Sequence, residues 1–212
     1  MKRTITVDDI ARALHQPLPG YEAQMRMATR PRSSAKEFGE RGMPRHGAVL
    51  LLLYPLGEQL FFPLTRRTER VAHHKGQIAL PGGAQEAADI SLWQTALRET
   101  QEEIGVPAAD VVQLGAMSSL YIAPSHFVVH PFVGSVAARP AFHPDPVEVA
   151  ELIEAPLMHL LDATAKEVQH WMLHDRPTEV PCYRYRGHVI WGATAMILSE
   201  MEAVLRQLLE ER

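Results

Sequence analysis

The chain has 212 residues, of which 46% are hydrophobic, and a formal net charge of −4 at pH 7. This length fits one domain with elaborations or two small ones, and the acidic balance gives no basic footprint for nucleic acid. A single cysteine, Cys182, excludes an internal disulfide and suits a reducing cytoplasm, and no apolar run is long enough to cross a membrane. We therefore expect a cytoplasmic protein that binds neither nucleic acid nor membranes.

The first 45 residues contain one predicted helix and a loop. Residues 6–10 begin a short amphipathic helix, which the proline–glycine turn at 17–20 should close. The stretch 28–45 is polar and contains two prolines, so it is predicted to be a loop. We expect residues 1–45 to be an N-terminal helix and lead-in packed on a domain that spans 46–212.

Several strands are predicted in the remainder of the chain. Residues 46–54 (HGAVLLLLY) form a continuous apolar run, which is typical of a strand buried on both faces. Residues 59–65 predict a hairpin partner across the turn at Gly57. Further strands are expected at 77–80, 111–119, 127–136 and 147–153, with a hairpin at 183–191. An apolar-periodic helix should begin at Gly192 and cover one face of the sheet.

The segment from Leu80 to Val106 (LPGGAQEAADISLWQTALRETQEEIGV) predicts a glycine turn followed by one helix. Ser91 with Gln94 three residues later is a capping-box pattern, and Gly105 marks the end of the helix. One side of this helix is mostly apolar and should pack on a core; it carries Trp93, Leu97, Thr100 and Ile104. Strands interleaved with two main helices predict an α/β/α sandwich around a mixed sheet.

The other side of this helix carries three carboxylates. Glu99, Glu102 and Glu103 lie within roughly 100° of one another on a helix. Arg98 stands one turn before Glu102, the spacing of a helical ion pair. Like charges at these spacings destabilise a helix, and a hard divalent cation would remove the repulsion. A solvated acidic face is the alternative, but the preceding glycines favour a metal site because they allow close backbone approach to a ligand.

At these residues the chain resembles a known family. Gly83 followed by the run 98–106 (RETQEEIGV) is similar to the Nudix box, G-x5-E-x7-R-E-U-x-E-E-x-G-U, where U is a bulky aliphatic residue. Thr100 stands where an aliphatic residue is expected, and the first half is one residue longer than the general pattern. No glutamate occupies its usual place in that half, where Asp89 or Glu86 is the candidate substitute.

The longer spacing resembles a Nudix subgroup of coenzyme A pyrophosphatases. The upstream signature of that subgroup is roughly L-L-T-x-R-x-x-x-L-R-x-H-x-G-x-x-x-F-P-G-G, and most of it is present in residues 64–83. Three positions depart from it: Val71 replaces a leucine, Ala72 an arginine and Leu80 a phenylalanine. The resemblance implies a Nudix-type α/β/α sandwich around a mixed sheet and hydrolysis of coenzyme A or an acyl-coenzyme A to 3′,5′-ADP and a phosphopantetheine.

Clustered carboxylates beside glycines suit Mg²⁺ or Mn²⁺. We assign Glu99 and Glu103 as the primary metal ligands because they lie one turn apart, while Glu102 adds a ligand or orients one through Arg98. The orienting role of Arg98 is what the family resemblance implies. A general base could come from outside the helix, and Glu148 is the candidate by weak resemblance, with an exposed strand-edge glutamate as the alternative.

Residues outside the helix are candidates for substrate binding. Arg67 and His74 match the subgroup and could contact phosphates, and Gly82 and Gly83 allow close approach. Ser125 lies in a segment, 121–127, that could form a substrate loop. Solvated or structural turns explain the histidine-rich segment and the 121–127 segment equally well.

Other function classes fit less well. Cys182 lacks any signature of an activated nucleophile, and the histidines do not have zinc-ligand spacing. Two alternatives remain: a Nudix hydrolase for ADP-ribose or a dinucleotide, and a catalytically silent Nudix domain that binds a nucleotide as a sensor. The intact carboxylates argue against the silent domain. The expected partner is a small nucleotide substrate, and the chain could act as a homodimer.

Overall fold

A computed structural model describes residues 5–32, 42–68 and 76–210. Its helices are α1 (Val7–Leu14), α2 (Gly20–Met25), α3 (Leu92–Ile104) and α4 (Gly192–Glu210). The large sheet comprises β1 (Arg45–Leu56), β2 (Gln59–Arg67), β3 (Ile78–Ala79), β4 (Gly82–Ala84), β5 (Val112–Ala116), β6 (Leu120–Ile122), β7 (Phe127–Ser135) and β8 (Val149–Pro156). A second sheet comprises β9 (Lys166–Leu173), β10 (Arg176–Tyr185) and β11 (His188–Ile190).

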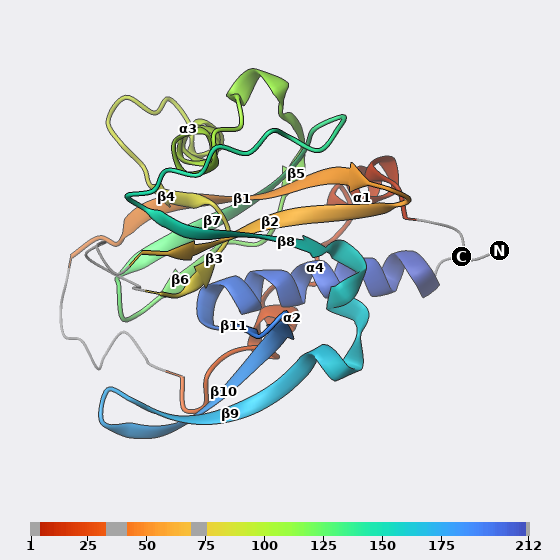
Figure 1. Cartoon of the computed structure of the whole chain (residues 1–212). Helices are drawn as coiled ribbons and strands as arrows, with labels where there is room; N and C mark the ends of the chain where they lie inside the picture. The colour runs from red at the N-terminus through yellow and green to blue at the C-terminus, as the bar shows by residue number, and fades with distance from the viewer. Residues whose placement is uncertain (1–4, 33–41, 69–75, 211–212) are drawn as a thin grey trace.

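The sandwich expected from the sequence is present. The large sheet has the order β3-β2-β1-β7-β5, with β4 on β1, β6 on β7 and β8 on β2. It is mixed, because β1 runs parallel to β7 and antiparallel to β2 and β4. Figure 1 shows α3 on one face of this sheet and α4 on the other, with the three-stranded sheet on the α4 side. Of the helices in the described residues, none is both long and apolar enough to span a membrane.

Strand β1 is the centre of the molecule, as its apolar run predicts. Residues 50–54 have no exposed surface. Leu50 and Leu52 belong to the core cluster beneath α3, while Leu51 and Leu53 belong to the cluster that packs on α4. Successive side chains of β1 point to opposite faces of the sheet, and each face is buried in one of the two cores. Both sets of side chains must therefore be apolar, which explains the run without polar residues.

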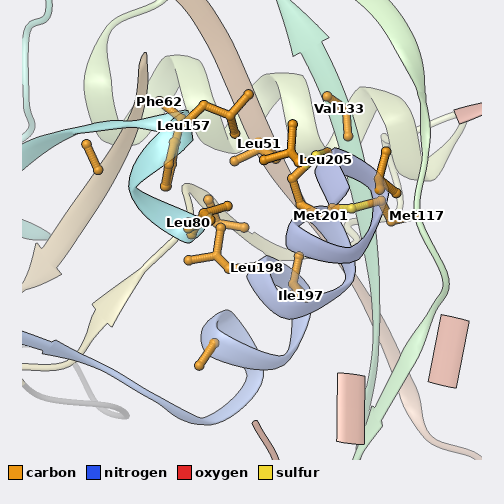
Figure 2. Close-up of a cluster of buried hydrophobic side chains, with 14 of the residues drawn as sticks. Leu51, Phe62, Leu80, Met117, Val133, Leu157, Ile197, Leu198, Met201 and Leu205 are labelled. Carbon is orange, nitrogen blue, oxygen red and sulfur yellow. The ribbon is translucent and has the colours of Figure 1, made fainter. Parts of the chain in front are cut away.

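The larger core lies between the sheet and α4. Figure 2 shows Leu51 and Val133 of the sheet packed around Leu198, Met201 and Leu205 of α4. Residues 194–205 of this helix are all buried, because α2 and the second sheet cover the sides that the large sheet leaves open. The helix predicted from Gly192 is confirmed.

Helix α2 is anchored through a buried carboxylate. Glu200 of α4 accepts hydrogen bonds from the Gly20 amide at 3.2 Å, the Gln24 side chain at 2.9 Å and the Ser118 amide at 3.2 Å. Helix α1 was predicted, and Thr6 caps it. Helix α2 was not predicted: it begins where only a turn was expected, and it is short and has no side-chain cap.

The strands differ from the prediction at three places. The strand expected over 111–119 ends at Ala116 as β5, and β6 was not predicted, since a loop was expected from Tyr121; between the two strands the Ser118 amide donates to Glu200. The expected glycine turn is a short strand, β4, that pairs with β1. Strand β9 was not predicted, since residues 166–173 lack a clean apolar–polar alternation.

Candidate active site

Helix α3 is fixed at both ends by residues that the sequence identifies. The Ser91 hydroxyl accepts a hydrogen bond from the Gln94 amide at 3.1 Å. The Gln94 side chain accepts from the Ile90 amide at 2.7 Å, one residue before the cap, so the capping box is present in a shifted form. Gly105 closes the helix at φ 73°, and a Cβ there would lie 2.7 Å from that of His143. Glycine is therefore required at this end.

The glycines of β4 bring the backbone against α3. Gly83 pairs with Ala48 of β1 and Gly82 with Val49. A Cβ on Gly83 would lie 2.5 Å from the carboxylate atoms of Glu99, and one on Gly82 would lie 2.3 Å from the Ala48 carbonyl oxygen. The close backbone approach expected of these glycines is present, although it comes from a strand and not from a turn.

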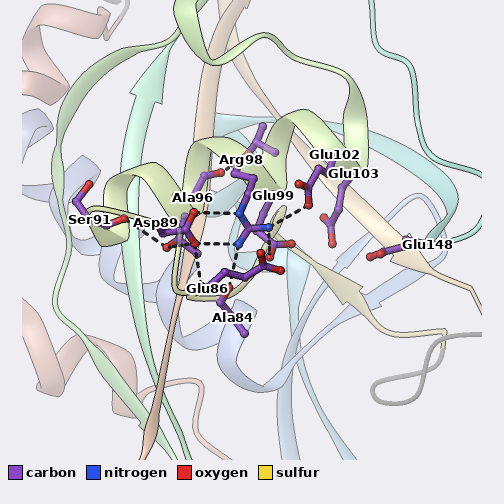
Figure 3. A network of polar contacts seen from close by, with 12 residues as sticks. Ala84, Glu86, Asp89, Ser91, Ala96, Arg98, Glu99, Glu102, Glu103 and Glu148 are labelled. Atoms are coloured by element: carbon purple, nitrogen blue, oxygen red, sulfur yellow. Dashed lines mark hydrogen bonds and ion pairs between the residues drawn. The ribbon is translucent and has the colours of Figure 1, made fainter.

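The three carboxylates of α3 differ sharply in exposure. The side chain of Glu102 is 60% exposed, that of Glu99 is 15% exposed and that of Glu103 only 3%. A solvated acidic face accounts for Glu102 alone. Figure 3 shows these side chains projecting from one side of α3, with Glu148 beyond Glu103.

Arg98 binds several groups at once. Its Nη1 lies 3.0 Å from Glu102, the predicted ion pair, and 2.9 Å from Glu99. Its Nε and Nη2 donate to the two oxygens of Asp89, each at 3.0 Å, and Nη2 also donates to the Ala84 carbonyl. Arg98 therefore connects the acidic residues of α3 to β4 and to the loop before the helix (Figure 3).

Asp89 is the buried partner of Arg98 in the loop before α3. Its side chain is only 2% exposed, and it also accepts hydrogen bonds from the Thr95 hydroxyl and the Glu86 amide, each at 2.9 Å. Hydrogen bonds from Arg98 hold the pKa of Asp89 well below its usual range, against the opposing effect of burial. Of the two candidates from the sequence, Asp89 is the one that bonds to Arg98.

Glu103 is the most strongly perturbed acid of the site. Burial raises its pKa to about 8; the nearby Arg67 and the Gly82 backbone oppose this rise, and the charges of Glu99 and Glu148 add to it. Its Oε1 lies 3.2 Å from Nη1 of Arg67, and its Oε2 is buried without a hydrogen-bond partner in the described part of the chain. A buried carboxylate oxygen without a partner carries a free-energy cost that a bound cation would remove.

The donor set fits a hard divalent cation in its chemistry. Glu99 and Glu103 lie one turn apart, Glu99 rests against the Gly83 backbone, and Glu103 has a free oxygen. Within the described ranges, no three carboxylate or imidazole side chains are close enough together to enclose a cation as they stand. Binding would therefore draw the side chains together, at the expense of their present ion pairs with arginines.

Glu148 lies beside the cluster, immediately before β8. Its Oε2 is 3.8 Å from Nη2 of Arg67, and its charge acts on both Glu99 and Glu103. The side chain is 44% exposed, so it can reach water. The structure thus brings together Glu148 and α3, which are distant in sequence, while the role of Glu148 as a base stays a prediction.

The other expected contacts are placed less completely. Ser125 lies in the turn between β6 and β7, near the start of β1, and has no interaction with α3 among the described residues. His74 lies outside the described residues. Arg67 faces carboxylates, and no sequence signal predicted its ion pair with Glu103, because the two residues meet only when the end of β2 and α3 pack together. Cys182 is buried with a pKa raised to about 11, which agrees with its exclusion as a nucleophile.

Comparisons with known proteins agree on one family. A model of the NUDIX domain matches residues 44–176. A protein of Pectobacterium atrosepticum described as "Uncharacterized Nudix hydrolase NudL" is 39% identical over 167 residues, covering 74% of this chain and 81% of that protein. A protein of Photorhabdus laumondii with the same description is 35% identical over 165 residues, covering 74% and 83%.

Solved structures support the fold. The MutT protein from Methanosarcina mazei Go1 superposes with a TM-score of 0.52 at 18% identity, covering 79% of this chain and 98% of that chain. A MutT/nudix family protein from Enterococcus faecalis gives a TM-score of 0.51 at 16% identity, covering 97% and 76%. At this level of identity the likeness concerns architecture alone.

Proposed function

The chain belongs to the NUDIX family, and from this premise we propose that it hydrolyses the phosphoanhydride bond of a nucleoside diphosphate derivative, using Mg²⁺ or Mn²⁺. One observation carries the proposal. Glu103 is buried beside Glu99 with an unpartnered oxygen, and the Gly83 backbone lies against Glu99. A folded protein keeps such an arrangement at a cost in stability, which suggests a bound ligand.

Glu99 and Glu103 would hold the cation, with the exposed Glu102 as a further ligand. When bound, the cation would neutralise charge on the phosphates and lower the pKa of a water molecule. Arg98 would keep Glu99 and Glu102 aligned, since it contacts both and is itself fixed by Asp89.

Glu148 is our proposed general base. It reaches solvent and lies next to the metal-binding carboxylates, where a base could take a proton from the attacking water. The breaking bond lies between phosphorus and the bridging oxygen, so water attack yields two phosphate monoesters. No protein nucleophile is needed, which agrees with the inert Cys182.

Coenzyme A, or an acyl-coenzyme A, is the substrate that we propose. The support is the upstream signature in residues 64–83, which resembles coenzyme A pyrophosphatases. Cleavage of the central anhydride would release 3′,5′-ADP and 4′-phosphopantetheine. Ala72 removes a cation found in the subgroup, so we expect weak affinity. If the 3′-phosphate is recognised, dephospho-coenzyme A should be cleaved clearly more slowly.

A substrate panel tests this proposal. The purified chain is incubated with coenzyme A, dephospho-coenzyme A, ADP-ribose and a diadenosine polyphosphate, each with Mg²⁺ and with Mn²⁺, and the products are separated by chromatography. We expect metal-dependent release of 3′,5′-ADP from coenzyme A. If ADP-ribose or the dinucleotide is cleaved much faster than coenzyme A, that compound replaces coenzyme A as the proposed substrate. If nothing is cleaved with either metal, the catalytically silent nucleotide-binding domain becomes the favoured alternative.

Metal binding is measured separately by calorimetry with Mn²⁺ alone. The wild-type chain should bind, and Glu103→Gln should bind at least about tenfold more weakly, since one charged ligand is lost. Equal affinities would remove Glu103 from the metal site whatever the panel shows.

A further inference from the structure

Two segments distant in sequence meet at the end of α3 and fix Glu148. The amides of His143 and Asp145 donate to the carbonyls of Ile104 and Glu103, each at 2.9 Å. These carbonyls belong to the last turn of the helix, where partners must come from outside it. The loop that precedes Glu148 is therefore tied to the same turn of α3 that carries Glu103.

The end of β2 holds this loop from the other side. The Thr68 amide donates to the Glu148 carbonyl at 2.9 Å, and its hydroxyl donates to the Val147 carbonyl at 2.7 Å. Thr68 directly follows Arg67, so the backbone places Arg67, Glu103 and Glu148 around one point. Only the side chain of Glu148, which is 44% exposed, keeps the freedom to turn away.

One guanidinium spans the two carboxylates. Nη1 of Arg67 lies 3.2 Å from Glu103 Oε1, and Nη2 lies 3.8 Å from Glu148 Oε2. The remaining nitrogen, Nε, is buried and has no partner in the described residues. A phosphate arriving from solvent cannot reach Nε, and it would have to compete with carboxylates for both terminal nitrogens.

Removal of Arg67 would leave Glu148 facing like charges. Glu99 and Glu103 act on the same point, and no other arginine or lysine of the described residues forms an ion pair with Glu103 or Glu148. Because Glu103 is held inside the protein and Glu148 is not, the repulsion would move Glu148 toward solvent. The base would then lose its place beside the metal ligands.

We propose that Arg67 is a positioning residue that holds Glu148 beside Glu103, and that it is not a ligand for the substrate's phosphates. The inference rests on the proposed function for its kinetic consequences. Its geometric part, the coupling of Arg67 to the two carboxylates, can be tested in a protein that turns nothing over.

Kinetics with the best substrate of the panel separate the two roles. For a positioning residue, Arg67→Ala should lower kcat by about 10- to 100-fold and change KM by less than about threefold, because a misplaced base slows the chemical step. Arg67→Lys should lower kcat nearly as much, since one ammonium group cannot span two carboxylates. If Arg67→Ala instead raises KM and keeps kcat, and Arg67→Lys restores the KM, Arg67 is a phosphate ligand and the proposal is overturned.

A double-mutant cycle shows whether Arg67 acts through Glu148. The variant with both Arg67→Ala and Glu148→Gln should have the same kcat as Glu148→Gln alone. If the two residues acted independently, their fold-reductions in kcat would multiply. Arg66→Ala is the matched control: Arg66 lies next in sequence, but it pairs with Glu151 at 3.0 Å, and Glu151 also contacts His188 of β11, on the side of the sheet away from α3. Any fold-change in kcat caused by Arg66→Ala should therefore multiply with the fold-change caused by Glu148→Gln.

Thermal unfolding without metal tests the geometry alone. At about pH 9, above the pKa of Glu103, the loss of melting temperature caused by Arg67→Ala should be clearly smaller in a Glu103→Gln background, because the ionised partner of Arg67 is then absent. Equal losses in the two backgrounds would overturn the proposal even if the wild-type chain cleaves nothing. An inactive wild type with coupled losses would instead overturn only the proposed function.

Discussion

The bond between Asp89 and Arg98 offers the sharpest test of how the acidic helix is held. We consider Asp89→Asn, which keeps the shape of the side chain and removes its charge. Asp89 is 2% exposed and Arg98 is 21% exposed, and two of the four hydrogen bonds to Asp89 come from the guanidinium. The asparagine can place its oxygen at only one of the two sites, so its amide nitrogen must face the Arg98 Nε–H or the other donors.

The magnitude follows from this geometry. Removing one partner of a buried ion pair costs about 3–5 kcal/mol. Arg98 is partly exposed and keeps Glu99 and Glu102, so we expect a loss of about 2–3 kcal/mol in the free energy of unfolding. For a chain of this size, that corresponds to a melting temperature lower by about 4–12 °C.

The pH dependence provides a second check on the same variant. The folded-state pKa of Asp89 lies below its unfolded value of about 3.9, so its contribution is present above that pH and is lost as the pH falls through the folded-state pKa. The difference between wild type and Asp89→Asn should therefore be full at pH 7 and shrink below about pH 4.

Differential scanning calorimetry measures both effects, with Asp110→Asn as the control. Asp110 is exposed in a short turn after α3, and this variant should melt like the wild type. If Asp89→Asn also melts like the wild type at pH 7, Asp89 does not anchor Arg98 and our description of the first half of the motif is wrong.

Three further predictions concern the same cluster. Arg98→Ala should weaken Mn²⁺ binding and kcat together and should destabilise the fold by more than the 1 kcal/mol or so of a surface ion pair, because it leaves a buried aspartate unpaired; unchanged Mn²⁺ titration curves would contradict this. Gly83→Ala should displace the Glu99 carboxylate, lowering kcat by about 100-fold with little change in melting temperature. Gly115→Ala is the control: its new methyl group would meet Leu14, far from the site, so it should lower the melting temperature and leave kcat nearly unchanged. Since the pKa of Glu103 is raised in the folded state, the metal-free protein should lose stability as pH rises from about 4.5 to about 8, and Glu103→Gln should flatten this slope in denaturant titrations; an unchanged slope would refute the assignment.

Local features of α3 could be predicted from the sequence because their partners lie within a few residues. Ser91 and Gly105 gave the helix ends, and the four-residue spacing gave the ion pair between Arg98 and Glu102. The alternative partners in the loop before the helix could not be distinguished, because the shape of that loop decides whether Asp89 or Glu86 meets Arg98.

Contacts made through tertiary structure were not predictable in the same way. The ion pair of Arg67 with Glu103 depends on how the end of β2 packs against α3, and the loop at 143–148 that is bonded to the end of α3 lies beside Glu103. On a helical wheel Glu103 lies nearer the apolar face than Glu102, but its burial to 2% exposure needs the surrounding chain.

Short or irregular elements were also missed, for related reasons. Helix α2 has too few residues for a periodic pattern, and its place is set by Glu200 of a helix far along the chain. The apolar run of β1 and the long helix α4 were predicted because each buries one continuous surface.

The role of Glu103 in metal-dependent hydrolysis is tested most directly by comparing wild type with Glu103→Gln on coenzyme A at saturating Mg²⁺ and Mn²⁺. Chromatography follows the release of 3′,5′-ADP, and circular dichroism confirms that the variant is folded. If Glu103 holds the catalytic cation, kcat should fall by about 100-fold or more in the folded variant, and removal of metal from the wild type should abolish the reaction. Wild-type turnover in Glu103→Gln at saturating metal would show that Glu103 does not hold the catalytic cation.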